Sequence, residues 1–276
     1  MKIVVIGGGA AGMMAACTAA EHGAKVTLIE RNSQLGIKVN ITGKGRCNVT
    51  NDSEPEALIK NTLTNGRFLY SAFAGLSAQD TMAFFERIGV PLKVERGKRV
   101  FPVSDNARDI TGALKTHLHR LGVTVLQHRV KNIVLKDGVV SGVSLQDGSV
   151  IEADRVILAT GGRSYPRTGS DGDGYRMAQA LGHTVTALRP SLVPLLTEET
   201  TPAQMEGLAL KNVTLTIKKD GKKIFSDFGE MVFTAKGISG PLVLSASAHL
   251  GVKKHTYPYE ALIDLKPALD ADTLDK

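Results

Sequence analysis

The chain of 276 residues lacks the patterns that mark secreted, metal-binding and membrane proteins. Its two cysteines, Cys17 and Cys47, are too few for a disulfide framework and have no metal-binding spacing. No uncharged apolar run reaches about 18 residues, so no transmembrane helix is expected. The first residues enter an apolar strand at once, followed by glycines and a helix, which is not the pattern of a signal peptide. These absences predict a cytoplasmic protein.

A concentrated charge of one sign is also absent. The 34 basic and 27 acidic residues give a net charge of +7, but the basic residues are dispersed along the chain. There is no arginine-rich helix and no basic stretch interleaved with aromatic residues, so nucleic acid is not the expected partner. The net charge still leaves an RNA-directed protein open as an alternative.

The most informative motif that is present is a glycine-rich turn near the N-terminus. A strand over residues 1–6 runs into Gly7-Gly8-Gly9-Ala10-Ala11-Gly12, and a second strand over residues 25–29 ends at Glu30. This arrangement predicts a dinucleotide-binding βαβ unit. Gly7 would allow the tight turn, Gly9 the approach of a pyrophosphate and Gly12 close helix packing. The helix N-terminus would attract phosphates, and Glu30 would accept hydrogen bonds from a ribose.

A second glycine-rich segment, Gly43-Lys44-Gly45-Arg46-Cys47-Asn48, lies within residues 36–51, where we expect an ordered loop. Its glycines would permit close approach and its cations would supply charge, so we expect it to contact a cofactor phosphate. It is not a P-loop, because Lys38 stands where that motif requires glycine and Gly45 where it requires Ser or Thr. Cys47 has no Cys-x-x-Cys partner, which favours a packing or cofactor-proximal structural role over a redox thiol.

The remaining pattern alternates helices and strands. Helices are predicted after a Ser77 cap and over residues 106–121 and 175–181, with a hairpin over residues 90–101. Asp-Gly turns join strands 130–135, 139–145 and 150–152 into an antiparallel meander, ahead of a strand at 155–159. A boundary is expected near residue 188. Beyond it we expect strands at 213–217, 223–225, 231–233 and 259–265, a helix capped by Ser239, and a helix start at 270–276.

Several motifs together resemble one protein family. Besides the two glycine-rich segments they are Val49-Thr50-Asn51 and residues 159–166, 169–175 and 233–241. The whole chain resembles the YhiN-like, aminoacetone-oxidase-type FAD flavoproteins. The resemblance implies an α/β fold: a glutathione-reductase-like FAD-binding Rossmann domain with an antiparallel β meander over residues 1–188, plus a β-rich inserted substrate domain begun by residues 189–276. Family members usually continue further, which implies a C-terminally truncated chain.

The resemblance also implies FAD-binding residues throughout the first domain. Arg31 would lie near the adenine, and Val130 would meet the adenine through its backbone. No second Gly-x-Gly-x-x-Gly is present, so an NAD(P)H donor would bind only transiently. The full implied set is Gly7, Gly9, Ala11, Gly12, Glu30, Arg31, Gly43, Gly45, Arg46, Cys47, Asn48, Val130, Thr160, Gly161 and Gly162.

The expected function is that of an FAD-dependent oxidoreductase acting on a small organic substrate, by amine oxidation or enone reduction. The flavin carries the electron chemistry, and the protein orients the substrate. No catalytic residue is assigned: Arg163 and Tyr165 follow the Gly161-Gly162 pair and are as compatible with lining the FAD as with facing a substrate. The alternatives are an RNA-directed flavoprotein partner and a non-catalytic fragment of a flavoenzyme.

Overall fold

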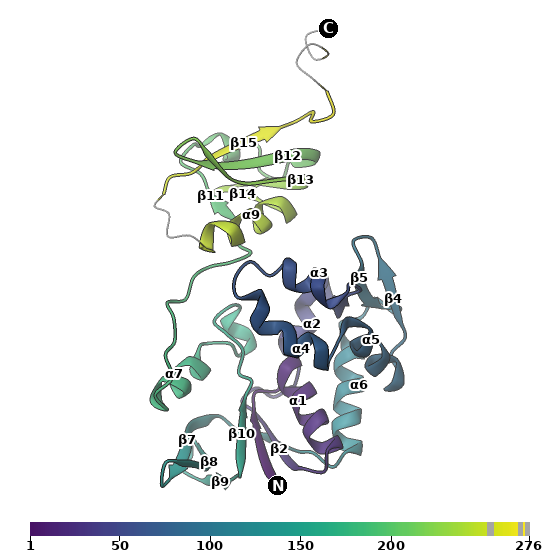
Figure 1. Ribbon diagram of the computed structural model, residues 1–276, viewed down its shortest axis with the longest axis vertical. Coiled ribbons are helices and arrows are strands. Elements are labelled where there is room, and N and C mark those ends of the chain that lie inside the picture. The colour runs from purple at the N-terminus through teal and green to yellow at the C-terminus, as the bar shows by residue number, and fades with distance from the viewer. Residues whose placement is uncertain (253–256, 270–272, 274–276) are drawn as a thin grey trace. The chain divides into compact units, whose positions relative to one another are not determined.

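The computed structural model describes residues 1–252, 257–269 and 273, which form two compact units (Figure 1). The first unit comprises residues 1–59 and 69–186, and the second comprises residues 60–68 and 187–276. The second unit therefore includes residues 60–68, which the sequence analysis assigned to the first domain. The assignment of the later residues to an inserted substrate domain stays a prediction.

A four-stranded parallel sheet forms the centre of the first unit. Its strands lie in the order β10 (Arg155–Leu158), β1 (Lys2–Ile6), β2 (Lys25–Glu30) and β6 (Thr124–Gln127). Strand β1 is apolar and buried on both faces, as a parallel sheet covered on both sides requires. Ile3 and Val5 belong to one core, whereas Val4 and Ile6 belong to another.

Helices build the core that contains Ile3 and Val5. Helix α1 (Ala10–Glu21) contacts α6 (Ala107–Arg120), and both contribute to this core together with α5 (Ala78–Arg87). The predicted Ser77 cap is confirmed, because Ser77 Oγ accepts from the Asp80 N–H at 3.0 Å. Helix α6 is capped by Asn106, whose Oδ1 accepts from the Arg108 N–H at 3.1 Å. These caps satisfy first-turn amides that have no partner within the helix.

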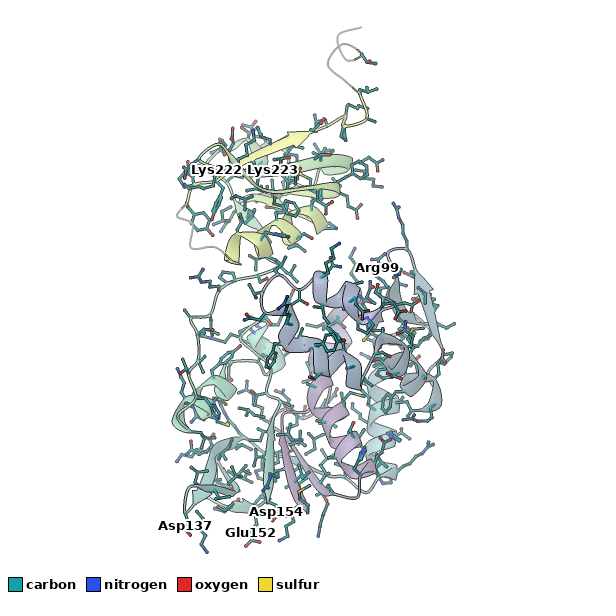
Figure 2. The ribbon with its side chains drawn as sticks, in the orientation of Figure 1. Arg99, Asp137, Glu152, Asp154, Lys222 and Lys223 are labelled. Carbon is teal, nitrogen blue, oxygen red and sulfur yellow. The ribbon has the colours of Figure 1, made fainter. Side chains whose placement is uncertain are left out.

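The predicted meander covers the other face of the sheet, beside β10 in Figure 1. It consists of β7 (Val130–Lys136), β8 (Val139–Leu145) and β9 (Val150–Glu152). Figure 2 labels Asp137 at its first turn, and Glu152 and Asp154 at the edge where the parallel strands begin. There the Lys2 amide donates to Asp154 Oδ2 at 2.6 Å, which joins β1 to the end of the meander.

The segment expected as a loop over residues 36–51 is partly helical, so this prediction is wrong in part. It contains α2 (Ile37–Ile41), the 3₁₀ helix η1 (Thr42–Gly45) and β3 (Thr50–Asn51). The five residues of α2 are too few to show helical periodicity in the sequence. Strand β3 joins the predicted hairpin of β4 (Leu92–Glu95) and β5 (Arg99–Pro102) in a small antiparallel sheet.

Further short elements lie outside the predicted pattern. They are α3 (Pro55–Lys60), η2 (Gly66–Leu69), α4 (Tyr70–Gly75) and η3 (Pro166–Thr168). The predicted helix before residue 181 is present as α7 (Asp173–Ala180). None of the described helices has both the length and the apolar character needed to cross a membrane.

The second unit is a five-stranded sheet with a helix against it. The strands lie in the order β11 (Leu195–Leu196), β14 (Gly237–Ser239), β13 (Lys222–Thr234), β12 (Ala209–Lys219) and β15 (Glu260–Asp264). Helix α9 (Pro241–Val252) buries Leu242, Val243 and Ala246 in its core, and α8 (Thr201–Gln204) precedes β12. Figure 2 labels Lys222 and Lys223 where β13 begins.

Three local predictions in this unit need comment. Residues 223–225 and 231–233 belong to the single strand β13, because residues 226–230 also pair with β12 although their side chains are polar or absent at most positions. Ser239 ends β14 and precedes the start of α9 by two residues, so it is not the cap. The expected helix start at residues 270–276 lies outside the described residues except for Thr273.

Candidate functional site

A cavity of about 890 Å³ lies in the first unit, where the parallel strands end. The segments that follow the carboxyl ends of all four strands contribute to it: Gly7–Gly9 after β1, Arg31 after β2, Arg129 after β6 and Ala159–Gly161 after β10. In open α/β sheets, ligands bind outside the carboxyl ends of the strands. The volume is within the range of sites for small molecules and cofactors.

The turn between β1 and α1 depends on glycine for steric reasons. Gly7 has φ +105°, which favours glycine, and its N–H donates to the Ile29 carbonyl at 2.8 Å. A Cβ at Gly12 would come within 1.8 Å of the Gly7 carbonyl oxygen. Gly12 is buried and is absent from the cavity lining, so glycine at this position serves the packing of α1.

The N-terminus of α1 opens on the cavity. Gly8, Gly9, Ala10 and Ala11 line it, and no side chain caps the helix. A Cβ at Gly9 would have no neighbouring atom within 4 Å, so this position borders open space. Amide groups of a helix N-terminus carry a partial positive charge that suits a phosphate group.

Glu30 lies beside this turn and is held firmly. Its Oε2 accepts from the Gly8 N–H at 2.6 Å, and its Oε1 accepts from the backbone and side-chain N–H groups of Asn32 at 2.8 and 2.7 Å. Three donors therefore fix the orientation of the carboxylate at the end of β2. A carboxylate has about four acceptor sites, which leaves room for a hydroxyl donor.

Two arginines at this end of the cavity are paired with carboxylates. Arg31 Nη1 lies 2.5 Å from Asp171 Oδ2, and Arg129 Nη2 lies 2.7 Å from Asp173 Oδ2 and 3.0 Å from Asp171 Oδ2. The hydrogen bond to Asp173 raises the pKa of Arg129. These pairs join the ends of β2 and β6 to the start of α7.

The second glycine-rich segment is arranged differently. Arg46 is paired with Glu95 and lies 2.6 Å from Asp105 Oδ1, with its guanidinium 4.1 Å from the centre of the Phe101 ring. Gly43, Gly45 and Arg46 are absent from the cavity lining, whereas Cys47 and Asn48 are part of it. Hydrogen bonding to Glu95 and Asp105 raises the pKa of Arg46, so its charge is already balanced by carboxylates.

Cys47 is buried and lines the cavity. Burial raises the pKa of its thiol, which keeps the sulfur protonated near neutral pH. Cys17 is a buried residue of α1, and burial raises the pKa of its thiol to about 11. Within the described part of the chain, no group of three or more His, Cys, Asp or Glu side chains is arranged to hold a metal ion.

The cavity thus brings together most of the residues predicted to bind the cofactor. It leaves out Gly12, Gly43, Gly45, Arg46 and Gly162, whose contact with a cofactor stays a prediction. Arg163 and Tyr165 are exposed and absent from its lining. The predicted residues that line the cavity are Gly7, Gly9, Ala11, Glu30, Arg31, Cys47, Asn48, Val130, Thr160 and Gly161.

Sequence reasoning missed Lys38, Asn32 and Ser170, which also line the cavity. The Lys38 Nζ donates to Ser170 Oγ at 2.6 Å and to the Ser164 carbonyl at 2.8 Å. Burial lowers the pKa of Lys38. The only sequence signal at this position was its mismatch to a P-loop, which says nothing about a cavity.

Comparison with known proteins finds sequence relatives that match nearly the whole chain. Residues 1–253 match the family described as HI0933-like protein Rossmann domain. A 3-dehydro-bile acid delta(4,6)-reductase of Clostridium scindens is 32% identical over 281 residues, covering 100% of this chain and 67% of the relative. A ribosomal RNA dihydrouridine synthase of Escherichia coli is 30% identical over 273 residues, covering 98% and 65%. The chain spans about two thirds of the length of these relatives.

Solved structures share the fold at lower identity. A flavocytochrome c3 fumarate reductase in its open conformation has a TM-score of 0.56 at 22% identity, over 76% of this chain and 47% of that one. A 3-ketosteroid-delta4-(5alpha)-dehydrogenase of Rhodococcus jostii has a TM-score of 0.53 at 22% identity, over 65% and 53%. With the parallel sheet and the antiparallel sheets, these likenesses confirm the predicted Rossmann-type FAD-binding fold.

Proposed function

Because the chain belongs to the HI0933-like Rossmann family, we propose that it is an FAD-dependent oxidoreductase that reduces a carbon–carbon double bond conjugated to a carbonyl group. The observation that supports FAD as the cofactor is the cavity where the strands end. It presents the uncapped N-terminus of α1, the open space beside Gly9 and the fixed Glu30 carboxylate. These groups fit the pyrophosphate and ribose of a dinucleotide.

The substrate class rests on what the two sequence relatives have in common. A delta(4,6)-reductase of a 3-dehydro bile acid acts on a double bond conjugated to a ketone, judged from its name. Dihydrouridine is uridine whose carbon–carbon double bond, conjugated to a carbonyl, has been reduced, and a second relative is named as its synthase. We therefore favour enone reduction over amine oxidation. The aminoacetone-oxidase resemblance stays a prediction.

FAD, when bound, would supply a hydride for the double bond, and NAD(P)H is the proposed reductant. The chain's own residues would hold the cofactor. The α1 N-terminus would bind phosphate, Glu30 would bind the ribose and Val130 would border the adenine. No side chain is assigned to proton transfer.

The test is anaerobic. The purified chain, loaded with FAD, is reduced with NADPH or NADH and then mixed with a conjugated enone or a saturated ketone. A primary amine is mixed with the oxidised flavin instead, because an amine substrate would donate electrons to the flavin and bleach it. The proposal expects the flavin absorbance to return only with the enone, with one saturated product formed per flavin reoxidised. Absorbance that neither carbonyl compound restores under nitrogen, although the flavin was reduced, would contradict it, as would bleaching of the oxidised flavin by the amine.

RNA is a second candidate substrate, because one group of relatives is named for ribosomal RNA. The charge distribution favours this candidate: residues 189–276 carry equal numbers of basic and acidic residues, so the net +7 arises within residues 1–188. Arg96, Lys98 and Arg99 are exposed at the β4–β5 turn, where Figure 2 labels Arg99.

The RNA candidate makes its own prediction. Binding of a ribosomal RNA fragment should weaken steeply as salt rises, because basic side chains displace counterions from the phosphates. Replacing Arg96, Lys98 and Arg99 by alanine together should weaken RNA binding and leave FAD binding unchanged. Elution of the wild-type chain that RNA does not alter at low salt would remove this candidate.

A further inference from the structure

Lys38 differs from the other long basic side chains of the cavity. Among the described lysines and arginines that line it, Arg31 and Arg129 are paired with Asp171 and Asp173, whereas Lys38 has no carboxylate partner. The residue is half-buried, and within the described part of the chain its ammonium donates to two neutral oxygens, those of Ser164 and Ser170. A partly desolvated cation without a counter-charge favours an anionic ligand.

The position of Lys38 points to the phosphate end of the cavity. It lies on α2, and the Gly36 N–H just before that helix donates to the Gly8 carbonyl at 2.8 Å. Its acceptor Ser170 is buried, and Ser170 Oγ would lie 2.8 Å from a Cβ at Gly161. Lys38 is therefore tied to the glycine turn on one side and to the end of β10 on the other.

Lys38 also holds a segment that borders the cavity, which we call the strap and define as residues 163–171. Gly161 with φ +74° and Gly172 with φ +96° lie just outside its two ends. Three side chains that follow β2 contact the strap: Arg31 contacts Asp171, Asn32 donates to the Thr168 carbonyl at 3.3 Å, and Lys38 donates to Ser164 and Ser170. The strap residues 168–171 line the cavity.

We propose that Lys38, rather than Arg46, is the cation that binds the pyrophosphate of the dinucleotide, and that the same ammonium holds the strap over it. This inference rests on the proposed function for its ligand. Arg46 is already balanced by Glu95 and Asp105, so it offers little free charge. One ammonium would then couple cofactor binding to the closure of residues 163–171.

The binding test compares Lys38→Met and Lys38→Arg with Lys25→Met, which removes an exposed lysine at the opposite end of β2. FAD and ADP are titrated at several salt concentrations, and thermal melting without ligand checks folding. Loss of one charge-assisted hydrogen bond should weaken both ligands about tenfold to a hundredfold in Lys38→Met. Its salt dependence should also be weaker, Lys38→Arg should recover much of the affinity, and Lys25→Met should match the wild type.

The strap test uses trypsin, because Arg163 and Arg167 are exposed in the strap. Cleavage after these residues, followed by mass spectrometry, should be about threefold faster or more in Lys38→Met, the change expected for loss of one ordinary hydrogen bond. ADP should slow this cleavage in the wild type and less in Lys38→Met. Ser170→Ala should also speed cleavage but keep the wild-type salt dependence of ADP binding, because the charge remains.

The two proposals fail in different ways. Wild-type protein that binds FAD and ADP, with Lys38→Met binding both equally well, overturns the role of Lys38 and leaves the proposed function standing. Loss of FAD binding without loss of ADP binding also overturns it, because the pyrophosphate is common to both ligands. Cleavage rates that are the same in all variants overturn the coupling to the strap. Wild-type protein that binds neither ligand overturns both proposals.

Discussion

The two glycine-rich segments of the first unit look alike in sequence and are used differently in the structure. Residues 7–9 turn tightly between β1 and α1, and residues 7–11 border the cavity. Residues 42–46 turn on themselves, with φ of +55° at Gly43, +59° at Lys44 and +85° at Gly45, and end in an arginine held by two carboxylates. Of these residues only Thr42 reaches the cavity, together with Cys47 and Asn48, which follow them.

The difference shows that glycine content alone does not identify a phosphate site. Gly12 is required because a Cβ would meet the Gly7 carbonyl, whereas Gly9 borders empty space. In the second segment the glycines allow left-handed backbone. The positive charge of Arg46 beside them is already balanced by Glu95 and Asp105. A functional glycine turn needs open space and unpaired charge beside it.

The largest expected effect is on Gly12. Gly12→Val places atoms against the Gly7 carbonyl and should destabilise the first unit by about 3 kcal/mol or more, with loss of FAD binding. Urea unfolding followed by circular dichroism measures the change. Gly112→Ala in α6 is the control, because a Cβ there meets nothing within 4 Å; it should stabilise the protein by about 0.5–1 kcal/mol. A Gly12→Val variant as stable as the wild type would show that the close approach is not rigid.

Gly9→Ala should separate binding from folding. Its backbone has φ −79°, which any residue adopts, and a methyl group meets no protein atom, so the unfolding midpoint should stay near that of the wild type. The methyl group would enter the space proposed for the pyrophosphate and should weaken FAD about tenfold or more, as displacement of a charged group from its donors does. Unchanged affinity in fluorescence titration would exclude this turn from the phosphate site.

Arg46→Met should show the opposite of Gly9→Ala, with a loss of stability and little change in FAD binding. The protein should melt at a lower temperature, because Glu95 and Asp105 lose the guanidinium that holds this loop to the hairpin. Affinity for FAD should change less than about threefold, below the effect of one charge-assisted hydrogen bond. Differential scanning calorimetry and FAD titration measure the two effects. A tenfold loss of affinity without a change in melting would restore the sequence-based prediction for Arg46.

The smallest expected effect is on thiol reactivity. Burial raises the pKa of both cysteines, so the reactive thiolate forms only at higher pH than in a free thiol, and alkylation by iodoacetamide at pH 8 should be slow at both. FAD should slow alkylation of Cys47, which lines the cavity, and leave Cys17 unchanged. Peptide mass spectrometry provides the comparison within one sample. Fast alkylation of Cys47 that FAD does not affect would contradict this placement.

The sequence predicted the parts of the fold that local patterns determine. The strand–turn–helix at Gly7, the Ser77 cap and the Asp-Gly turns of the meander each have a short-range physical cause. It missed α2, whose five residues show no period, and it split β13 where polar residues interrupt the apolar pattern.

At the site, the sequence predicted residues beside recognisable motifs and missed those brought in by the tertiary structure. Nothing near Lys38 in the sequence indicates that its ammonium meets Ser164 and Ser170, which are 126 and 132 residues away. In the same way, the partners of Arg46 are Glu95 in the β4–β5 hairpin and Asp105 just after it, 49 and 59 residues further along the chain. Pairing of charges across the fold decides which cation is available to a ligand.

The central claim is that the cavity where β1, β2, β6 and β10 end holds the adenosine diphosphate half of FAD. Calorimetric titration of the purified chain with FAD, ADP and FMN tests it most directly. The account predicts that FAD and ADP bind and compete for one site, whereas FMN, which lacks the adenosine half, binds at least about a hundredfold more weakly, since several hydrogen bonds are lost. Binding of FMN as tight as that of FAD, without competition from ADP, would contradict it.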